Sequence, residues 1–251
     1  MKTFPALLAL CIAIAICTSA RADIAAILSG RDNTLYQDPS GGLSNGAGTG
    51  MFAGRNAAAN NSIRRGLVWF DIASTIPAGS TITGATLTLY NSAANSGDAT
   101  VSLHRALELW GEGASVAGGS GGGGGGPAAP GDATWLYRDF PLIVWANPGG
   151  TFDPVSSASA TVAGTGTYNW SSPVLINDIQ LFLDGPSANF GWAILGDESA
   201  PSTAKRFATR EETAADLRPM LLIEYTPVPA PGAAVALTLF SLATVGSRRR
   251  R

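Results

Sequence analysis

The chain has 251 residues, of which 31 are glycine and only 14% are charged, and its formal net charge is −2. Residues 23–227 contain all 18 acidic residues but only 10 of the basic ones, which gives this stretch a net charge of −8. Nucleic-acid binding needs clustered lysine and arginine to neutralise phosphate, so this composition argues against a nucleic-acid partner.

The first 22 residues have the layout of a secretory signal peptide. Lys2 is followed by an apolar stretch over residues 4–17, and the small residues Ala20 and Ala22 suit a signal peptidase. We expect cleavage after Ala22 and export through the Sec translocation machinery. Both cysteines lie in this segment, so the mature chain would have no thiol for a disulfide, a metal ligand or a nucleophile.

Residues 23–227 alternate between short apolar stretches and turn-forming residues. In "GATLTLYNS", Ala85, Leu87 and Leu89 alternate with polar residues or tyrosine, which is typical of a strand with one buried face. "RRGLVWFDI" is apolar on both faces, as expected of a central strand. We expect a single all-β domain, a jelly-roll-like antiparallel β-sandwich. Its further strands are predicted at 25–29, 51–55, 100–106, 134–137, 159–163, 189–195, 206–209 and 217–225.

One helix and one long loop interrupt the strand pattern. Ser172 suits the N-cap, Pro173 the first helical position and Gly185 the end of a short helix that closes one end of the sandwich. Residues 111–133 contain a run of glycines, which lose the most backbone freedom on ordering and have no side chain to bury. We therefore expect a flexible surface loop without regular structure.

Residues 228–251 form a tail with three parts. Pro229 and Pro231 precede an uncharged run over residues 232–246. As a helix this run would reach only about 22 Å, short of the roughly 30 Å hydrocarbon core, and residues 228–231 and 247 extend it to a marginal membrane span. Arginines at its end would stay in the cytoplasm and leave the domain outside. The arginines are Arg248, Arg249, Arg250 and Arg251.

This tail resembles the PEP-CTERM sorting signal of Gram-negative bacteria that make exopolysaccharide, with Ala230 at the position of the family's glutamate. The resemblance implies a hydrophobic C-terminal helix that anchors the protein at least transiently in the membrane. It also implies an exosortase-like membrane protease as a partner and a final place at the cell surface or in the extracellular matrix. A plain C-terminal anchor is the alternative.

Several stretches follow one another along the domain: "RDNTLYQD", "RRGLVWFDI", "IPAGSTITGATLTLY", "VSLHRALELWGEG", "ATWLYRDF", "YNW", "FGWAILGDES", "KRFATREE" and "RPMLLIEYTP". Their order resembles the DNRLRE domain, a secreted β-sandwich related to carbohydrate-binding modules, although the glycine-rich loop is longer than the family's usual link. The resemblance implies a sandwich that contacts polysaccharide. The matching positions are Arg64, Phe70, Asp71, Trp110, Glu112, Trp135, Arg210 and Glu211.

These positions also have a purely architectural interpretation, in which Arg64 or Arg210 pairs with Glu211 or Asp71 at the rim of the sandwich. For sugar binding, an aromatic face covers the apolar face of a pyranose while polar groups bond its hydroxyls. Trp69 and Trp192 lie within predicted strands and are expected in the core. The candidate carbohydrate-binding residues lie at strand ends or in loops: Trp110, Trp135, Trp145, Trp170, Arg210 and Glu211.

Catalytic chemistry has little support in the sequence. The one histidine, His104, lies inside a predicted strand, where a structural partner is the commoner finding. Glycoside cleavage needs two facing carboxylates, for which the candidates by type are Asp32, Glu108, Glu112, Asp197, Glu198, Glu211 and Glu212. No cofactor is expected beyond a structural calcium ion, whose oxygen ligands would come from Asp32, Asp197 and Glu198.

The sequence thus favours a non-enzymatic exported protein that binds or organises extracellular polysaccharide. Two alternatives stay open, because one sandwich fold hosts many roles. One is a polysaccharide-degrading or disaggregating envelope enzyme that uses a carboxylate pair. The other is a purely structural surface protein without a glycan ligand.

Overall fold

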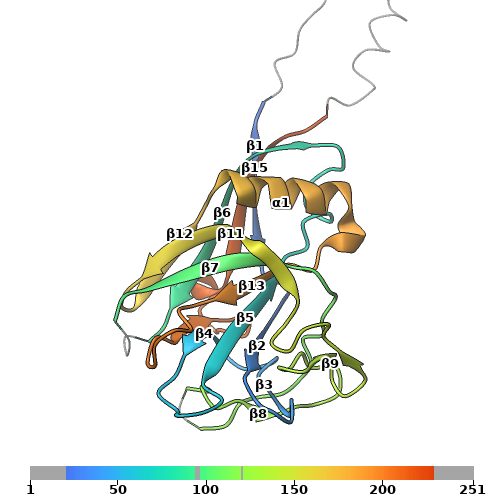
Figure 1. Ribbon diagram of the computed structural model, residues 1–251. Helices are drawn as coiled ribbons and strands as arrows, with labels where there is room; N and C mark the ends of the chain where they lie inside the picture. The colour runs from blue at the N-terminus through green and yellow to red at the C-terminus, as the bar shows by residue number, and fades with distance from the viewer. Residues whose placement is uncertain (1–20, 94–96, 120, 229–251) are drawn as a thin grey trace, which may run out of the picture.

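All strand pairs in the described part of the chain are antiparallel, as the alternating apolar pattern predicts. The computed structural model describes residues 21–93, 97–119 and 121–228, which form a β-sandwich with one α-helix (Figure 1). Nearly all of the predicted signal peptide and sorting tail, with their two expected helices, lies outside the described residues. The strands are β1 (Asp23–Leu28), β2 (Arg31–Tyr36), β3 (Leu43–Ser44), β4 (Gly50–Arg55), β5 (Ile63–Trp69), β6 (Thr81–Asn91), β7 (Ala99–Ala106), β8 (Gly126–Pro127), β9 (Tyr137–Asp139), β10 (Ile143–Val144), β11 (Phe152–Val162), β12 (Gly166–Trp170), β13 (Trp192–Leu195), β14 (Lys205–Ala208) and β15 (Met220–Thr226).

Two layers face each other, and β4 connects them. One layer contains β1, β15, β6, β12 and β14, and the other contains β2, β5, β13, β7 and β11. The first part of β4 pairs with β14, whereas Gly54 and Arg55 pair with β5. Because one strand belongs to both layers, the sandwich is a single sheet of eleven strands that folds over its own core.

The core explains the two sequence patterns that predicted it. Leu87 and Leu89 of β6 point into the main cluster between the layers, while Thr86 and Thr88 point outward. In β5, Val68 belongs to this main cluster, but Leu67 faces a second apolar cluster on the outer side of the layer. The prediction that β5 is covered on both faces is therefore confirmed. All described strands and both clusters lie within residues 23–227, so this stretch contains a complete core of its own.

The predicted helix is present as α1 (Pro173–Asp184), which crosses one end of the sandwich (Figure 1). The Oγ atom of Ser172 accepts the backbone N–H of Leu175 at 3.0 Å, which satisfies one of the free donors of the first turn. The helix buries an apolar face that includes Leu175, Ile179 and Phe182. It ends at Gly185, as expected.

Replacement of Ser172 by alanine is expected to lower the free energy of unfolding by about 1 kcal/mol, because the Leu175 N–H loses its cap. Urea unfolding followed by circular dichroism measures this loss. Ser171→Ala is the matched control, since Ser171 is the exposed neighbour outside the cap. Equal losses for the two variants would contradict the capping role.

Some predicted strand boundaries are wrong, and local turns explain the differences. No strand spans 134–137, because a tight turn links Thr134 to Tyr137 through both backbone and hydroxyl hydrogen bonds, and β9 starts only at Tyr137. The strand expected from residue 189 starts at Trp192, after a 3₁₀ turn, η1 (Pro186–Ala188). Gly191 then has φ +72°, and a Cβ atom there would lie 2.1 Å from the carbonyl oxygen of Val68.

The strand expected from residue 217 starts at Met220, after η2 (Ala215–Leu217), and the strand expected at 159–163 belongs to the longer β11.

Both ends of the described chain leave the sandwich at the end that α1 closes, opposite the end with β3 and β8 (Figure 1). Within the described residues no helix has the length and apolar character that a membrane span requires.

Candidate binding groove

The glycine-rich loop is held against the sandwich by side chains that bond its backbone. It remains irregular except for β8, which pairs with β3. Three consecutive glycine carbonyl groups accept hydrogen bonds: Arg206 Nε donates to Gly121 at 3.1 Å, Tyr36 Oη to Gly122 at 2.8 Å and Arg64 Nε to Gly123 at 3.1 Å. These contacts place the loop on the ends of β2, β5 and β14. The loop therefore forms the wall of a site.

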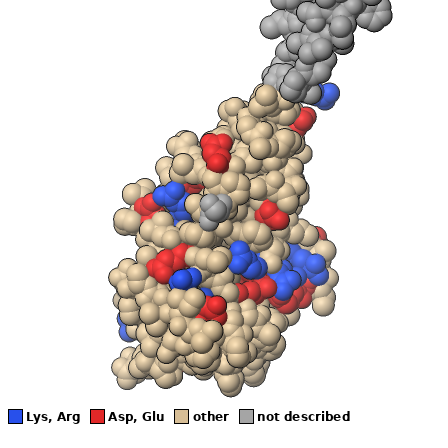
Figure 2. All heavy atoms as spheres, turned by 90° about the vertical axis from the view of Figure 1, so that its right-hand side faces the viewer, with Lys and Arg blue, Asp and Glu red and all other residues tan. Residues whose placement is uncertain are grey.

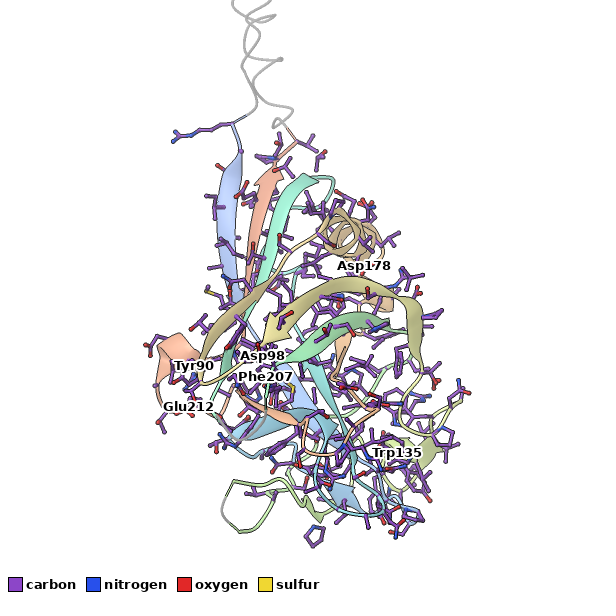
Figure 3. The ribbon with its side chains drawn as sticks, turned by 60° about the vertical axis from the view of Figure 1, so that its left-hand side comes forward. Tyr90, Asp98, Trp135, Asp178, Phe207 and Glu212 are labelled. Carbon is purple, nitrogen blue, oxygen red and sulfur yellow. The ribbon has the colours of Figure 1, made fainter. Side chains whose placement is uncertain are left out.

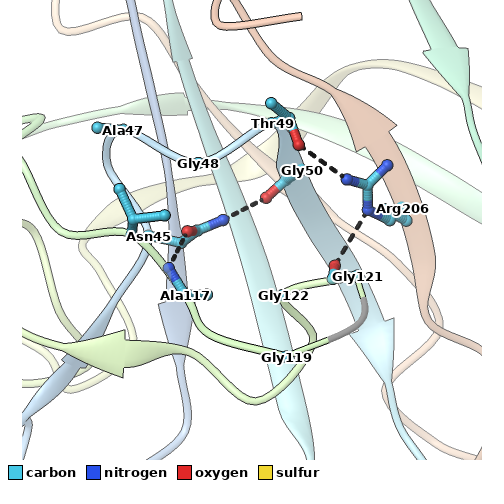
Figure 4. A pocket seen from close by; sticks show the side chains of 11 residues that line it. Asn45, Ala47, Gly48, Thr49, Gly50, Ala117, Gly119, Gly121, Gly122 and Arg206 are labelled. Carbon is cyan, nitrogen blue, oxygen red and sulfur yellow. Dashed lines mark hydrogen bonds between the residues drawn. The ribbon is translucent and has the colours of Figure 1, made fainter.

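Two hollows lie side by side along this wall and share Gly121 and Arg206; together we call them the arginine groove. The first has a volume of about 170 Å³, and the Arg206 side chain closes one side of it (Figure 4). The second has a volume of about 350 Å³ and is lined by Phe52, Asn56 and Arg64 in addition to the shared residues. The remaining polar side chains of the first hollow are those of Asn45 and Thr49.

Within the part of the chain that the structure describes, the two arginines of the groove form no ion pair, unlike four other arginines of the domain. Elsewhere, Arg65 pairs with Glu198, Arg105 with Asp153, Arg138 with Glu108 and Arg210 with Glu112. In the described residues, neither Arg64 nor Arg206 has a carboxylate within ion-pair distance.

Arg64 and Arg206 use part of their donors on neutral acceptors. Arg206 donates to Thr49 Oγ1 and Ser92 Oγ as well as to the loop. Arg64 is only 5% exposed; it donates to backbone carbonyls and lies over the Tyr36 ring at 4.9 Å. Burial lowers the pKa of the Arg64 guanidinium, but an arginine keeps its charge at any physiological pH.

This arrangement suits an anionic, hydroxyl-rich ligand. A guanidinium presents a planar set of donors that matches a carboxylate, and charge-assisted bonds of this kind are about twice as strong as neutral ones. The amides of Asn45 and Asn56 can bond hydroxyl groups. The described lining of both hollows contains no aspartate or glutamate, so the groove does not hold a pair of facing carboxylates.

Three of the four tryptophans predicted as binding platforms have rings that are covered by protein in this structure. Trp110 is 1% exposed, Trp145 4% and Trp170 0%. Each donates its indole N–H to a buried or partly buried carbonyl oxygen, namely those of Phe190, Thr134 and Val101.

Trp135 is the one candidate that keeps part of its ring exposed, and the guanidinium of Arg65 lies 4.9 Å from its ring centre. Of the two tryptophans expected in the core, Trp192 is fully buried. Trp69 is only half-buried, with Arg31 stacked 4.3 Å from its ring centre.

Arg210 and Glu211 belong to a charged cluster with Glu112 and Asp32, in which the two glutamates are partly buried and the Arg210 side chain is 42% exposed. Both ends of the Arg210 guanidinium contact the Glu112 carboxylate, at 2.6 and 2.9 Å, and Nε also lies 3.0 Å from Glu211. The architectural pairing of Arg210 with Glu211 is thus confirmed, whereas the pairing suggested for Arg64 does not form. Arg210 uses its Nε and Nη2 donors on Glu112 rather than in the groove.

Asp32 is fully buried in this cluster. Its Oδ2 atom accepts the backbone N–H of Arg210 at 2.9 Å, but Oδ1 has no hydrogen-bond partner. Burial raises the pKa of Asp32 well above the usual carboxyl range, the Arg210 N–H lowers it in part, and the charges of Glu211 and Glu112 raise it further. Burial also raises the pKa of Glu211.

The three predicted calcium ligands do not form a site. Asp32 lies in the cluster just described, Glu198 forms a two-pronged ion pair with Arg65, and Asp197 accepts hydrogen bonds from Ser199. No group of three or more histidine, cysteine, aspartate or glutamate residues could hold a metal ion within residues 21–93, 97–119 and 121–228.

His104 has the structural partners expected of a histidine within a strand. One ring nitrogen lies 2.8 Å from the carbonyl oxygen of Asp153 and the other 3.0 Å from Ser102 Oγ, and the ring packs on Phe152.

On the face of the molecule in Figure 2, acidic and basic side chains intermingle and form no large patch of one sign. This pattern agrees with the ion pairs of Arg65, Arg105, Arg138 and Arg210.

No protein-family model and no curated protein matches this chain.

Sequence reasoning missed most of the groove. The sequence does not predict that Arg206 and Asn45 belong to one site, because they lie about 160 residues apart in the chain. Only the fold brings them together. The sequence predicts for Arg64 only a match to a family position and a pairing with Glu211 or Asp71. The usable signal was the glycine run itself, because a loop without side chains exposes its carbonyl groups to neighbouring donors.

Proposed function

We propose that the protein is an exported, non-enzymatic cell-surface or matrix protein that binds extracellular polysaccharide through the arginine groove. The observation that supports this best is the pair Arg64 and Arg206, which line adjacent hollows with no carboxylate partner in the described residues. In a domain with net charge −8, two arginines on adjacent hollows are a local concentration of positive charge that attracts an anionic group. Polysaccharides rich in uronate carry carboxylates and hydroxyls of the required kind.

The position of the groove supports the same proposal. The glycine-rich loop lies at the end of the sandwich opposite the chain ends (Figure 1). If the C-terminal tail holds the protein at a membrane, this end points away from it toward the matrix. Export by the Sec machinery, processing by an exosortase-like protease and the DNRLRE-type resemblance belong to the proposal and rest on the sequence.

Affinity electrophoresis of residues 23–227 through gels that contain uronate-rich or neutral polysaccharides tests the groove. We expect retardation by at least one acidic polymer, and about tenfold weaker binding for Arg206→Ala, because a charge-assisted hydrogen bond is lost. Arg206→Lys should bind with intermediate strength, since it keeps the charge but not the planar donors.

Arg138→Ala is the matched control. It removes the same charge from a different hollow, where Arg138 already pairs with Glu108. Equal weakening by both alanine variants would mean that only net charge matters. Free migration of the folded wild-type domain through every polymer would overturn the proposal.

A further inference from the structure

β1 differs from the other edge strands of the two layers, which are β12, β2 and β11. β2 is almost completely buried, and β12 is short, begins at Gly166 and exposes the polar side chains of Thr167 and Asn169. β11 contains Pro154 and has two register shifts against β7. Proline, irregular register and cover by other elements are the devices that prevent an edge strand from pairing with another chain.

β1 has none of these devices. It pairs with β15 in one regular register over its full length, and β15 is its only strand partner in the described residues. Figure 3 shows β1 as the outermost strand beside β15. Its sequence after Asp23 is IAAIL, without a charge or a proline. On its outer face, Ile24 is 67% exposed and Leu28 47% exposed.

We propose that β1 pairs antiparallel with β1 of a second copy of this chain, about a two-fold axis that passes through Ala26. In each copy, β1 lies at the edge of one layer. Pairing would join these two layers, one from each copy, into a continuous sheet across the dimer. This proposal concerns a different surface from the arginine groove and does not depend on glycan binding.

The side chains of β1 are self-complementary in this register. Residues on the same face of an antiparallel pair lie directly opposite each other, so Ile24 meets Leu28 of the second copy, and Ala26 meets Ala26. On the inner face, Ala25 meets Ile27 of the second copy. Asp23 meets a serine rather than another charge. The two large exposed apolar side chains of β1 thus gain an apolar neighbour, and the free backbone groups of the edge gain partners.

The geometry also predicts which form of the protein dimerises. Antiparallel pairing points the C-terminal ends of the two copies in opposite directions. We therefore expect the dimer in the form released from its tail, rather than between two copies anchored side by side in one membrane. A dimer would carry two grooves, which increases the avidity for a polymer.

Sedimentation-equilibrium measurements on residues 23–227 test the pairing through two double variants. In Ile24→Lys/Leu28→Lys, lysines lie opposite each other at two places in the dimer, and dimerisation should weaken by at least about tenfold. In Ile24→Lys/Leu28→Glu, each lysine lies opposite a glutamate, and the dimer should form again. Val155→Lys on β11 is the control, since Val155 is also exposed, at 63%, and should leave the dimer unchanged.

Circular dichroism and thermal unfolding confirm that each variant is folded. A wild-type domain that stays monomeric up to its solubility limit would overturn the proposal. A dimer that responds equally to both double variants would overturn the register, and a dimer that Val155→Lys disrupts would place the interface at the other edge.

Discussion

Trp170→Ala is expected to lower the free energy of unfolding by about 3–5 kcal/mol, the largest loss of any single substitution considered for this protein. The Trp170 ring is fully buried in the main cluster and packs edge-on against Phe207, with 5.9 Å between ring centres. Its indole N–H donates to the carbonyl oxygen of Val101 at 2.8 Å. Alanine would leave a cavity and a buried carbonyl without its donor. Urea unfolding of residues 23–227 measures the change.

Two further variants separate this structural role from a role in binding. Trp170→Phe keeps most of the volume and should lose clearly less stability than Trp170→Ala. Trp135→Ala removes a ring that is already partly exposed and should also lose less. If Trp170→Ala kept its stability but lost affinity for polysaccharide, the tryptophan would be a binding platform after all, as the sequence suggested.

Asp32→Asn is expected to raise the free energy of unfolding at neutral pH by roughly 1–3 kcal/mol, because it removes a buried charge with an unpartnered oxygen atom. The asparagine oxygen can still accept the Arg210 backbone N–H. The charges of Glu112 and Glu211 also repel the Asp32 carboxylate, and this repulsion disappears in the variant.

The sign of the pH dependence follows from the raised pKa of Asp32. Between the usual carboxyl pKa and the raised value, the folded state binds more protons than the unfolded state, so wild-type stability falls as the pH rises through this window. The advantage of Asp32→Asn should therefore grow with pH. In Asp32→Asn, the fall in stability with rising pH should be smaller than in the wild type but still present, because burial raises the pKa of Glu211 as well.

Urea unfolding at several pH values tests both statements. Asp197→Asn is the matched control, because it makes the same chemical change where hydrogen bonds from Ser199 lower the pKa of an exposed carboxyl. It should lower stability at neutral pH instead of raising it. A loss of stability in Asp32→Asn would mean that the Asp32 carboxylate is favourably bound, for example by a cation.

The groove and the β1 edge lead to one picture of the protein in a matrix. A domain with a single groove binds a polysaccharide chain, whereas an edge-paired dimer presents two grooves and can connect two chains. The two proposals can fail separately. A monomer that binds polysaccharide would preserve the groove alone, and a dimer without affinity for any polymer would leave a protein that assembles only with itself.

The class of fold and the main secondary-structure elements followed from the sequence alone. Alternation over β6 identified its buried face, because side chains of a strand point to opposite sides. The apolar run in β5 identified a strand covered twice, and the serine, proline and glycine around α1 marked both helix ends. These signals are local, so neighbouring residues suffice to show them.

The site depended on contacts that no local pattern records. Whether Trp110 or Trp170 is a platform or a core residue is decided by the segments that cover its ring, and those segments lie far away in the chain. Asp32 and Glu198 are both carboxylates, yet the fold pairs Glu198 with Arg65 and buries Asp32. The sequence determined which strands and which helix form, because backbone preferences act over a few residues. Only the tertiary structure decided which arginines have a carboxylate partner and which aromatic rings reach solvent, because both depend on long-range packing.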